Sequence, residues 1–555
     1  MSATRGALLA IVISATAVSP SFAQASPDTA AASVDAKPLA SLDLFSAGAR
    51  TTGLPTSLWK GASADLAHRV LAGLGAQPVE PGLAQLARDI LETAASAPDS
   101  AGADADLAGD RVLSLIRLGD LDAARAILAR TPGVGGRPRL SQAAADLALW
   151  TGDPDRACSI SEALSDGRDT AYWLQLRAFC LIRTGKLEQA QLALDFAAQA
   201  GARNSQLQHL LAAAQGAKSA ASEPAQTSNA LGFAVSRLGK ADFSPAIPSA
   251  PTSALIALSA DESQPADVRR RAAVKLLASG ASSAEAIRSA LRTPVEPPKT
   301  VAAPQTGRRK GQHAATPAGE DPADALARDY QAATGAASNA ERAAALVRLF
   351  RNAHGAAFRN LCEVIAPELA LVTPDGVGGA DRALLALAAS VVDAPSAPLL
   401  RDGLTTGDGV SGVDLALLDA VRDMGAVEPK VSKTAGALVK VGAETVGTEQ
   451  TRAQTGAVLM AAFDSRFSGL SPAQRATFAA FRAGSAVKLA AALTALSAAD
   501  KGAPGEAALA TLDAATETGL AAADRALFIR ALGHAGLERN ARSIALDGLL
   551  ALTGH

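Results

Sequence analysis

Residues 184–190 read Thr-Gly-Lys-Leu-Glu-Gln-Ala, and similar strings stand at 118–124 (Leu-Gly-Asp-Leu-Asp-Ala-Ala) and 151–157 (Thr-Gly-Asp-Pro-Asp-Arg-Ala). Their glycines, at positions 119, 152 and 185, are 33 residues apart, and each lies between two apolar segments with helical spacing. Glycine readily adopts the left-handed conformation that ends a helix. An alanine follows each glycine after five residues, where a second helix needs a small side chain to cross the first. The strings therefore predict three helix–turn–helix units.

These units resemble the tetratricopeptide repeat, which pairs a helix A, a glycine turn and a helix B in about 34 residues. The resemblance covers about residues 105–203. It departs from the family at Arg177, where leucine is usual, and at the equivalent Arg111 and Ala144. The third unit fits best, and its residues at the family's core positions are Leu174, Ala178, Leu181, Gly185, Leu187, Ala190, Leu194 and Ala197. The resemblance implies an α-α superhelix, or solenoid.

The C-terminal part of the chain carries a repetition of its own. Residues 375–385 (Asp-Gly-Val-Gly-Gly-Ala-Asp-Arg-Ala-Leu-Leu) return 33 positions later as 408–418 (Asp-Gly-Val-Ser-Gly-Val-Asp-Leu-Ala-Leu-Leu). Near the end, Leu532, Gly536 and Ala541 echo the glycine-turn pattern. We expect a second helical array here, of a different kind from the first.

The composition agrees with an all-α fold. Hydrophobic residues make up 48% of the 555 residues and aromatic residues only 3%, with alanine and leucine supplying most of the apolar content. Alanine loses no side-chain entropy in a helix, so this mixture favours helix over strand. The formal net charge of −2 gives the whole chain no electrostatic attraction to nucleic acid or anionic lipid.

The first residues have the pattern of a secretory signal. Arg5 precedes the short apolar stretch 6–18, and Ala23-Gln24-Ala25 supplies small residues for cleavage. The alternative is an N-terminal membrane anchor, but the apolar stretch is shorter than the roughly 20 residues that span a bilayer. No later segment is long and apolar enough to span either. The alanine-rich, arginine-over-lysine composition is typical of a high-GC bacterium, so we expect export to the periplasm.

The expected organisation is two helical halves joined by a proline-rich linker. Its predicted parts are a signal peptide at 1–25, a disordered or extended segment at 26–53, TPR-like repeats at 54–216, a helical continuation at 217–293, a disordered linker at 294–322 and a C-terminal helical repeat region at 323–555. The linker contains six prolines and a basic run at 308–310, which we interpret as solubilising. The sequence does not indicate an oligomeric state.

Three cysteines follow the leader. Cys158 falls in helix B of the second unit and Cys180 in helix A of the third. Adjacent helices of a solenoid touch, and disulfides persist in the periplasm, so we predict a Cys158–Cys180 disulfide. The alternative is two buried free thiols. Cys362 is left over and is expected to be buried rather than reactive.

No catalytic, cofactor-binding or metal-binding motif is legible. Residues 407–412 match the dinucleotide-binding GxGxxG string, but no β-branched strand precedes them, and we interpret them as an inter-helix turn. Walker A, GxSxG, HExxH and zinc-spaced Cys/His sets do not occur in the sequence. The six histidines are scattered and lack partner spacing. We expect no cofactor and no metal.

The tetratricopeptide resemblance implies a ligand-facing groove on the helix-A surface. Arginine and aromatic side chains often carry the binding energy of interfaces, which makes this surface the candidate for partner binding. The alternative is that these side chains cap helices or face solvent. The groove candidates are Arg117, Gln142, Trp150, Tyr172, Gln175, Phe179 and Arg183.

The leading functional hypothesis is a periplasmic helical-repeat scaffold that binds another envelope protein or an extended peptide and is not an enzyme. One alternative is a peptidoglycan-related envelope enzyme with its site in the C-terminal half, since some lytic transglycosylases carry helical superhelices. Their signature Glu-Ser string occurs in this chain only at 262–263, outside the C-terminal half. The other alternative is a structural spacer.

Overall fold

The computed structural model describes residues 43–217, 224–280, 283–295, 321–426, 429–463, 486–515 and 520–555. Within these residues every regular element is an α-helix or a short 3-10 helix, which confirms the all-α class. The predicted signal peptide at 1–25 and the basic run at 308–310 lie outside the described residues. Of the predicted disordered segment, the described residues 43–53 pack against the protein, and Phe45 among them is fully buried.

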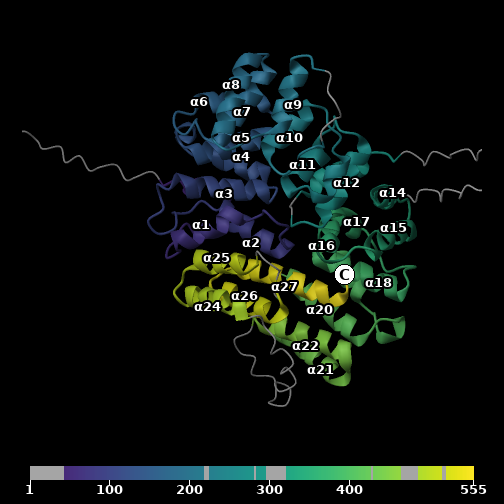
Figure 1. The fold of residues 1–555 in the computed structure, drawn as a ribbon. Helices are drawn as coiled ribbons and strands as arrows, with labels where there is room; N and C mark the ends of the chain where they lie inside the picture. Colours follow the sequence, from purple (N-terminus) through teal and green to yellow (C-terminus); the bar gives the residue numbers. More distant parts are fainter. Residues whose placement is uncertain are drawn as a thin grey trace, which may run out of the picture. The chain divides into compact units, whose positions relative to one another are not determined.

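The N-terminal part of the described chain is a series of short antiparallel helices (Figure 1). Neighbouring helices pack in order, with strong contacts between α3 and α5, α5 and α6, and α7 and α8. The helices are α1 (Ala64–Gly73), α2 (Pro81–Glu92), α3 (Ala105–Arg117), α4 (Leu121–Arg130), α5 (Pro138–Trp150), α6 (Pro154–Ala163), α7 (Ala171–Arg183), α8 (Leu187–Gln199) and α9 (Ser205–Ala214), with the 3-10 helix η1 (Val134–Gly136) before α5.

The three glycine strings form the predicted turns. Their glycines have φ angles of +84°, +78° and +74° and directly follow the C-caps of α3, α5 and α7. The alanines five residues further on, Ala124, Ala157 and Ala190, are 0% exposed. Small residues therefore lie where the second helix of each pair crosses its neighbours. Membership of the tetratricopeptide family stays a prediction.

A middle group of helices packs against the first. Helix α10 contacts both α5 and α9, and α11 contacts α3 and α5. These helices therefore cover part of the surface that the α3–α5 array would otherwise present to solvent. The group comprises α10 (Ala230–Leu238), the 3-10 helix η2 (Ser244–Ser249), α11 (Thr252–Ala260), α12 (Ala266–Leu277) and α13 (Ala284–Arg292).

The C-terminal part is again a series of helix pairs. Its most extensively packed neighbours include α14 with α15, α21 with α22, α24 with both α25 and α26, and α26 with α27. The elements are α14 (Pro322–Thr334), α15 (Asn339–Arg351), α16 (Gly355–Val364), α17 (Ala366–Leu369), α18 (Gly379–Val391), α19 (Ser396–Arg401), η3 (Thr406–Asp408), α20 (Gly412–Gly425), α21 (Val431–Glu444), α22 (Gly447–Ala461), α24 (Ala486–Asp500), α25 (Pro504–Ala515), α26 (Ala522–His534) and α27 (Glu538–Thr553).

The last helices pack back on the first ones. Figure 1 shows α1 and α2 beside α25 and α27, and all residues of α2 except Gln85 are buried. Gly82 permits the close approach, because a Cβ atom there would lie 2.6 Å from the carbonyl oxygen of Ser543. The Gly82 amide donates to Asp547, whose carboxylate also pairs with Arg359 of α16. Helices α2, α16 and α27 therefore share one polar junction.

Helices on the two sides of the predicted linker are in direct contact. Helices α12 and α13 precede the linker, and both pack against α14 and α16, which follow it. Together with the contact between α2 and α27, this arrangement gives one compact unit from residue 42 onward. The structure therefore does not show two separate helical halves.

Candidate functional site

The two aromatic residues of the predicted groove lie inside the protein. Trp150 is 5% exposed, and its ring centroid lies 5.0 Å from that of Phe233 on α10. Phe179 of α7 is 1% exposed. Because both side chains are buried, neither is open to a partner. The sequence pattern of α5 and α7 does not reveal which residues pack on them, so it could not predict this burial. This part of the groove prediction is corrected by the structure.

The two arginines of the predicted groove hold the protein's own groups. Arg117 is half-buried and donates to the carbonyl oxygens of Leu71, Ala72 and Leu74 at 3.3, 2.9 and 2.9 Å, at the C-terminal end of α1. Carbonyls at a helix C-terminus lack intrahelical donors, so Arg117 satisfies them. Arg183 pairs with Asp155 of α6.

The polar candidates Gln142, Tyr172 and Gln175 also have internal partners. The Tyr172 hydroxyl donates to Asp146 at 2.7 Å, and Arg139 donates to Gln142 at 3.0 Å. Gln175 donates to the carbonyl oxygen of Ala202 at 3.3 Å and accepts from the Asn204 amide at 3.3 Å. Burial raises the pKa of Asp146 to about 6 even though the tyrosine hydroxyl and two arginines favour its charged form. The polar side chains of the predicted groove therefore have their hydrogen-bond partners within the protein.

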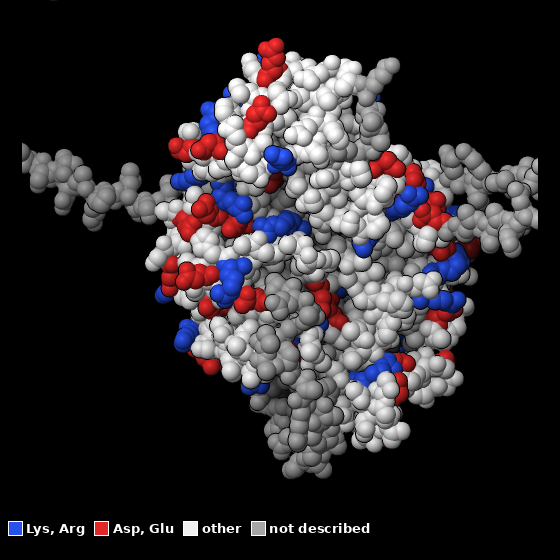
Figure 2. Space-filling model, in the orientation of Figure 1, with Lys and Arg blue, Asp and Glu red and all other residues white. Residues whose placement is uncertain are grey.

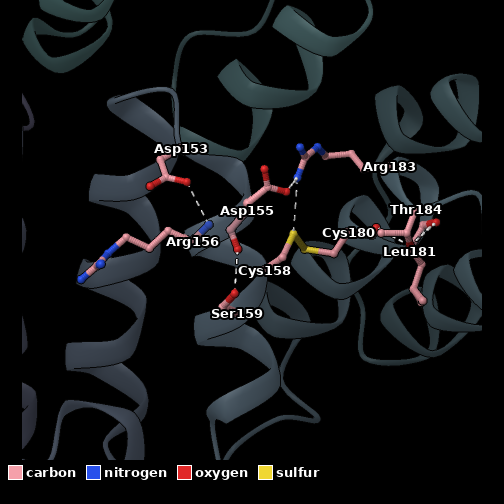
Figure 3. Close-up of a disulfide and its surroundings, with 9 residues drawn as sticks. All are labelled: Asp153, Asp155, Arg156, Cys158, Ser159, Cys180, Leu181, Arg183 and Thr184. Atoms are coloured by element: carbon pink, nitrogen blue, oxygen red, sulfur yellow. Dashed lines mark hydrogen bonds and ion pairs between the residues drawn. A yellow bond between two sulfur atoms is a disulfide. The ribbon is translucent and has the colours of Figure 1, made fainter. Parts of the chain in front are cut away.

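The structure joins Cys158 of α6 to Cys180 of α7, as the sequence predicts (Figure 3). Their Cα atoms lie 5.6 Å apart, and both residues are half-buried. Arg183 lies beside the bond: its Nη1 atom is 2.9 Å from an oxygen of Asp155 and 4.0 Å from the Cys158 Sγ atom. Cys362 is fully buried, and burial raises the pKa of its thiol well above the ordinary value.

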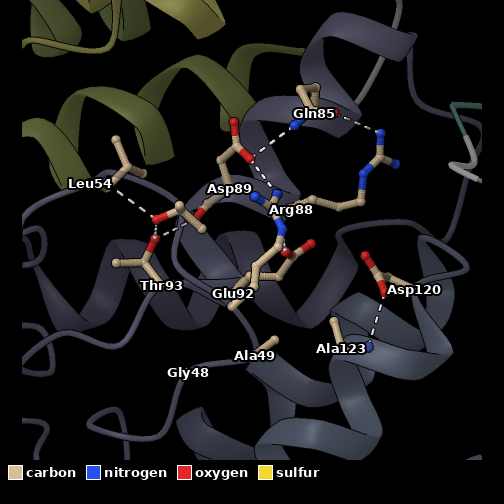
Figure 4. Close-up of polar contacts among 12 residues, drawn as sticks. Gly48, Ala49, Leu54, Gln85, Arg88, Asp89, Glu92, Thr93, Asp120 and Ala123 are labelled. Carbon is tan, nitrogen blue, oxygen red and sulfur yellow. Dashed lines mark hydrogen bonds and ion pairs between the residues drawn. The ribbon is translucent and has the colours of Figure 1, made fainter.

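A cluster of buried carboxylates on α2 has no counterpart among the sequence predictions (Figure 4). Asp89 is 0% exposed and accepts hydrogen bonds from Arg50, Gln85, Arg539 and Asn540 at 2.7, 2.9, 3.1 and 2.8 Å. Burial opposes ionisation of Asp89, but these donors outweigh it and lower the pKa. The cluster connects the first helices with α27. Partners some 450 positions apart leave no local signal in the sequence.

Glu92, one turn further along α2, has the opposite electrostatic balance. It is 2% exposed and contacts Arg50. Burial and the neighbouring carboxylate of Asp120 raise its pKa to about 7, against the attraction of Arg50. A carboxyl group with this pKa is suited to acid–base chemistry. Its burial, however, leaves no approach for a substrate in this conformation, so we interpret the cluster as structural.

The C-terminal half contains a small cavity of about 190 Å³. Both strings of the 33-residue repetition contribute to its walls, through α18 and through the turn that leads into α20. The GxGxxG glycines belong to this turn: Gly409 has a φ of +78°, and Gly412 begins α20. The carboxylate in the cavity wall, Asp414, is 40% exposed and paired with Arg452 at 2.5 Å. The lining residues are Ala380, Ala383, Leu384, Leu387, Gly409, Val410, Asp414, Leu418, Thr553 and His555.

The most exposed apolar pair on one N-terminal helix lies on α8. Leu192 and Phe196 are 54% and 48% exposed and stand one turn apart. The buried face of this helix uses other residues, namely Ala190, Ala193, Leu194 and Ala197. Helix α8 therefore carries two apolar stripes, and we call the exposed pair Leu192 and Phe196 the α8 strip. Apolar residues on two faces of one helix are a sequence pattern from which this exposed surface could have been predicted.

Among the described residues, no group of histidine, cysteine and acidic side chains could hold a metal ion. The described helices also include none that is long and apolar enough to cross a membrane. Searches against protein families, curated proteins and solved structures find no match to this chain.

Proposed function

We propose that this protein is an exported helical scaffold that binds another envelope protein or an extended peptide through the α8 strip. The observation that carries the proposal is the exposure of Leu192 and Phe196, since large apolar groups side by side on a surface are typical of contact sites. An exposed aromatic residue is also a frequent source of interface energy. Acidic side chains flank the strip, because Glu188 and Asp195 of α8 are exposed, and Figure 2 shows acidic side chains among otherwise uncharged surface at the end of the molecule where α8 lies.

Export to the periplasm is supported by two independent features. The first 25 residues have the pattern of a cleaved leader. The Cys158–Cys180 bond is of a kind that persists in oxidising compartments and is rare in the cytosol. N-terminal sequencing of the protein isolated from cells tests this point, and the expected first residue follows the Ala23-Gln24-Ala25 string.

The two alternative functions have less support. A peptidoglycan-acting enzyme needs a carboxyl group with access to substrate and a raised pKa. The cavity of the C-terminal half contains Asp414, which is solvated and paired with Arg452. Glu92 has the raised pKa but is buried. A structural spacer does not need an exposed apolar strip, which costs solubility without a partner to cover it.

The test is affinity purification of the tagged mature protein from crosslinked envelopes. The test variant is Leu192→Ser with Phe196→Ser, which removes the α8 strip. A matched control is Leu371→Ser with Leu399→Ser, because these leucines are 57% and 56% exposed but lie elsewhere. A third sample carries Arg117→Ala, Trp150→Ala and Arg183→Ala, the residues of the groove predicted from sequence.

The proposal expects one crosslinked partner to be recovered by the wild type and by the control, and lost from the α8 variant with unchanged circular dichroism. Recovery of that partner by the α8 variant would assign binding to another surface. Absence of a specific partner from the wild type would favour the spacer. Loss from the groove sample alone, with its fold intact, would restore the groove hypothesis.

A further inference from the structure

Helices α7, α8 and α9 pack mainly on one another. Their main contacts with the other described helices are with α6, which touches α7, and with α10, which touches α9, and the Tyr172 hydroxyl of α7 donates to Asp146 of α5. Two side-chain connections between α6 and α7 stand close together: the Cys158–Cys180 bond and the ion pair of Arg183 with Asp155 (Figure 3). The disulfide therefore adds a covalent side-chain cross-link between the α7–α9 group and α6, besides the main chain.

The two sulfur atoms have different surroundings. The guanidinium of Arg183 lies 4.0 Å from Cys158 Sγ, and Figure 3 shows it pointing at that atom from α7. Asp155 neutralises this arginine only in part, because its side chain is 87% exposed and solvated. A positive charge at this distance stabilises a thiolate on Cys158. Among the described residues, no lysine or arginine forms a hydrogen bond to the Cys180 Sγ atom, and the Cys180 carbonyl oxygen accepts from the Thr184 hydroxyl.

We propose that this disulfide is a thiol-exchange site, with Cys180 as the sulfur attacked by an external thiol and Cys158 as the leaving group. The incoming thiolate forms a bond to Cys180 Sγ, the Cys158–Cys180 bond breaks, and its electron pair leaves on Cys158 as a thiolate beside Arg183. Exchange is faster when the leaving thiol has a lower pKa, which is the contribution of the arginine.

The co-reactant is a dithiol. Its first sulfur forms the mixed disulfide with Cys180, and its second sulfur attacks the first, which releases Cys180 as a thiolate that takes a proton from water. The dithiol is oxidised to a disulfide and the protein is reduced by two electrons. The exchange removes the side-chain cross-link between α7 and α6. Cys362 takes no part, because it is fully buried and its thiol pKa is raised. This inference is independent of the partner proposed for the α8 strip.

The experiment treats the folded mature protein with glutathione as a monothiol probe. The reaction is stopped with acid, free thiols are then blocked with N-ethylmaleimide, and the modified cysteines are identified by mass spectrometry. The rate of reduction by dithiothreitol is measured in parallel for Arg183→Gln, Arg183→Lys and Arg156→Gln. Arg156 is the matched control, since it is exposed on α6, two residues from Cys158.

The proposal expects glutathione on Cys180 and N-ethylmaleimide on Cys158. It expects Arg183→Gln to slow reduction about threefold or more, because the leaving thiolate loses its cation. Arg183→Lys keeps most of the rate, and Arg156→Gln leaves it unchanged. Glutathione chiefly on Cys158, or an Arg183→Gln rate equal to that of Arg156→Gln, would overturn the assignment. A wild-type disulfide that resists dithiothreitol until the protein unfolds would also overturn it.

Discussion

Arg111 of α3 and Arg177 of α7 occupy the same position in two units of the 33-residue spacing, but the burial of their side chains differs. Arg111 is 1% exposed and donates to the carbonyl oxygens of Phe45, Leu91 and Thr93 at 3.1, 2.7 and 2.9 Å. Burial lowers its pKa to about 10. Arg177 is exposed. At the same position of the 33-residue spacing, Arg111 is therefore buried and hydrogen-bonded, whereas Arg177 is exposed to solvent.

The neighbours of the two helices explain the difference. Helix α3 is contacted by α1, α2, α4 and α5, and residues 43–53 supply further carbonyl groups. Helix α7 has its main contacts with α6, α8 and α9. Helix α3 is therefore held by noncovalent contacts on several sides. The α7–α9 group has fewer neighbours and is held in addition by a disulfide cross-link.

The largest expected effect comes from the two arginines themselves. Arg111→Ala leaves the buried carbonyl oxygens of Leu91 and Thr93 without the donors they have now, and it leaves that of Phe45 with the Ala95 amide alone. The free energy of unfolding should fall by about 4 kcal/mol. Arg177→Ala removes an exposed side chain and should change it by less than about 0.5 kcal/mol. Urea denaturation followed by circular dichroism measures both. Equal effects of the two substitutions would contradict the comparison.

The next effect concerns the covalent link of the outer group. Replacing both cysteines by serine, Cys158→Ser with Cys180→Ser, opens a loop whose ends are separated by 22 residues. The chain-entropy argument gives a loss of about 3 kcal/mol for a loop of this size. Hydrogen exchange should become faster in α7–α9 and remain unchanged in α2 and α3. Cys362→Ser serves as the control for cysteine loss, and uniform acceleration across all helices would contradict the expected localisation.

A third substitution tests the close packing of the central helices. Gly82→Ala places a Cβ atom 2.6 Å from the Ser543 carbonyl oxygen, so α2 and α27 must move apart at a cost of about 2 kcal/mol. Gly436→Ala in α21 is the matched control, because a Cβ there meets nothing within 4 Å. Alanine should stabilise that helix by about 0.5–1 kcal/mol. Thermal melts of the two variants should therefore shift in opposite directions, and shifts of the same sign would count against the tight contact.

The smallest expected effect is a pH dependence from Glu92. Its pKa is raised from 4.5 to about 7 in the folded protein, so the folded state binds the proton more tightly than the unfolded state. Stability should therefore fall as pH rises above about 4.5, and the fall between pH 6 and 8 should be about 1 kcal/mol. Asp146 contributes in the same direction, mainly below pH 6, and His555, whose pKa is lowered by burial, contributes in the opposite direction. The contribution of Glu92 is therefore isolated by comparing the wild type with a Glu92 variant between pH 6 and 8.

Glu92→Gln should flatten the stability profile in that range, as measured by urea midpoints at each pH. Glu444→Gln changes an exposed carboxylate on α21 and should leave the slope as in the wild type. Equal slopes for the wild type and Glu92→Gln between pH 6 and 8 would show that Glu92 is ionised in the folded state.

Local features of the fold could be predicted from the sequence. The glycine at the end of α7 and the buried Ala190 follow from backbone freedom and side-chain size, which depend on the residue and its immediate neighbours. The Cys158–Cys180 pair was predictable for a related reason, since consecutive helices in an antiparallel series touch. The candidate groove was less predictable. Trp150 is buried because Phe233 of α10 packs on it, and the resemblance that suggested the groove does not extend to α10.

The sequence by itself determined the all-α class, the positions of the three glycine turns and the cysteine pair. These features depend on helix propensity and on spacing within about one repeat length. Only the tertiary structure decided that α27 returns to α2, that Asp89 meets Arg539 and Asn540, and that the pKa of Glu92 is raised to about 7. Burial and charge pairing depend on residues brought together from distant parts of the chain, and no local pattern encodes which distant helix covers a given face.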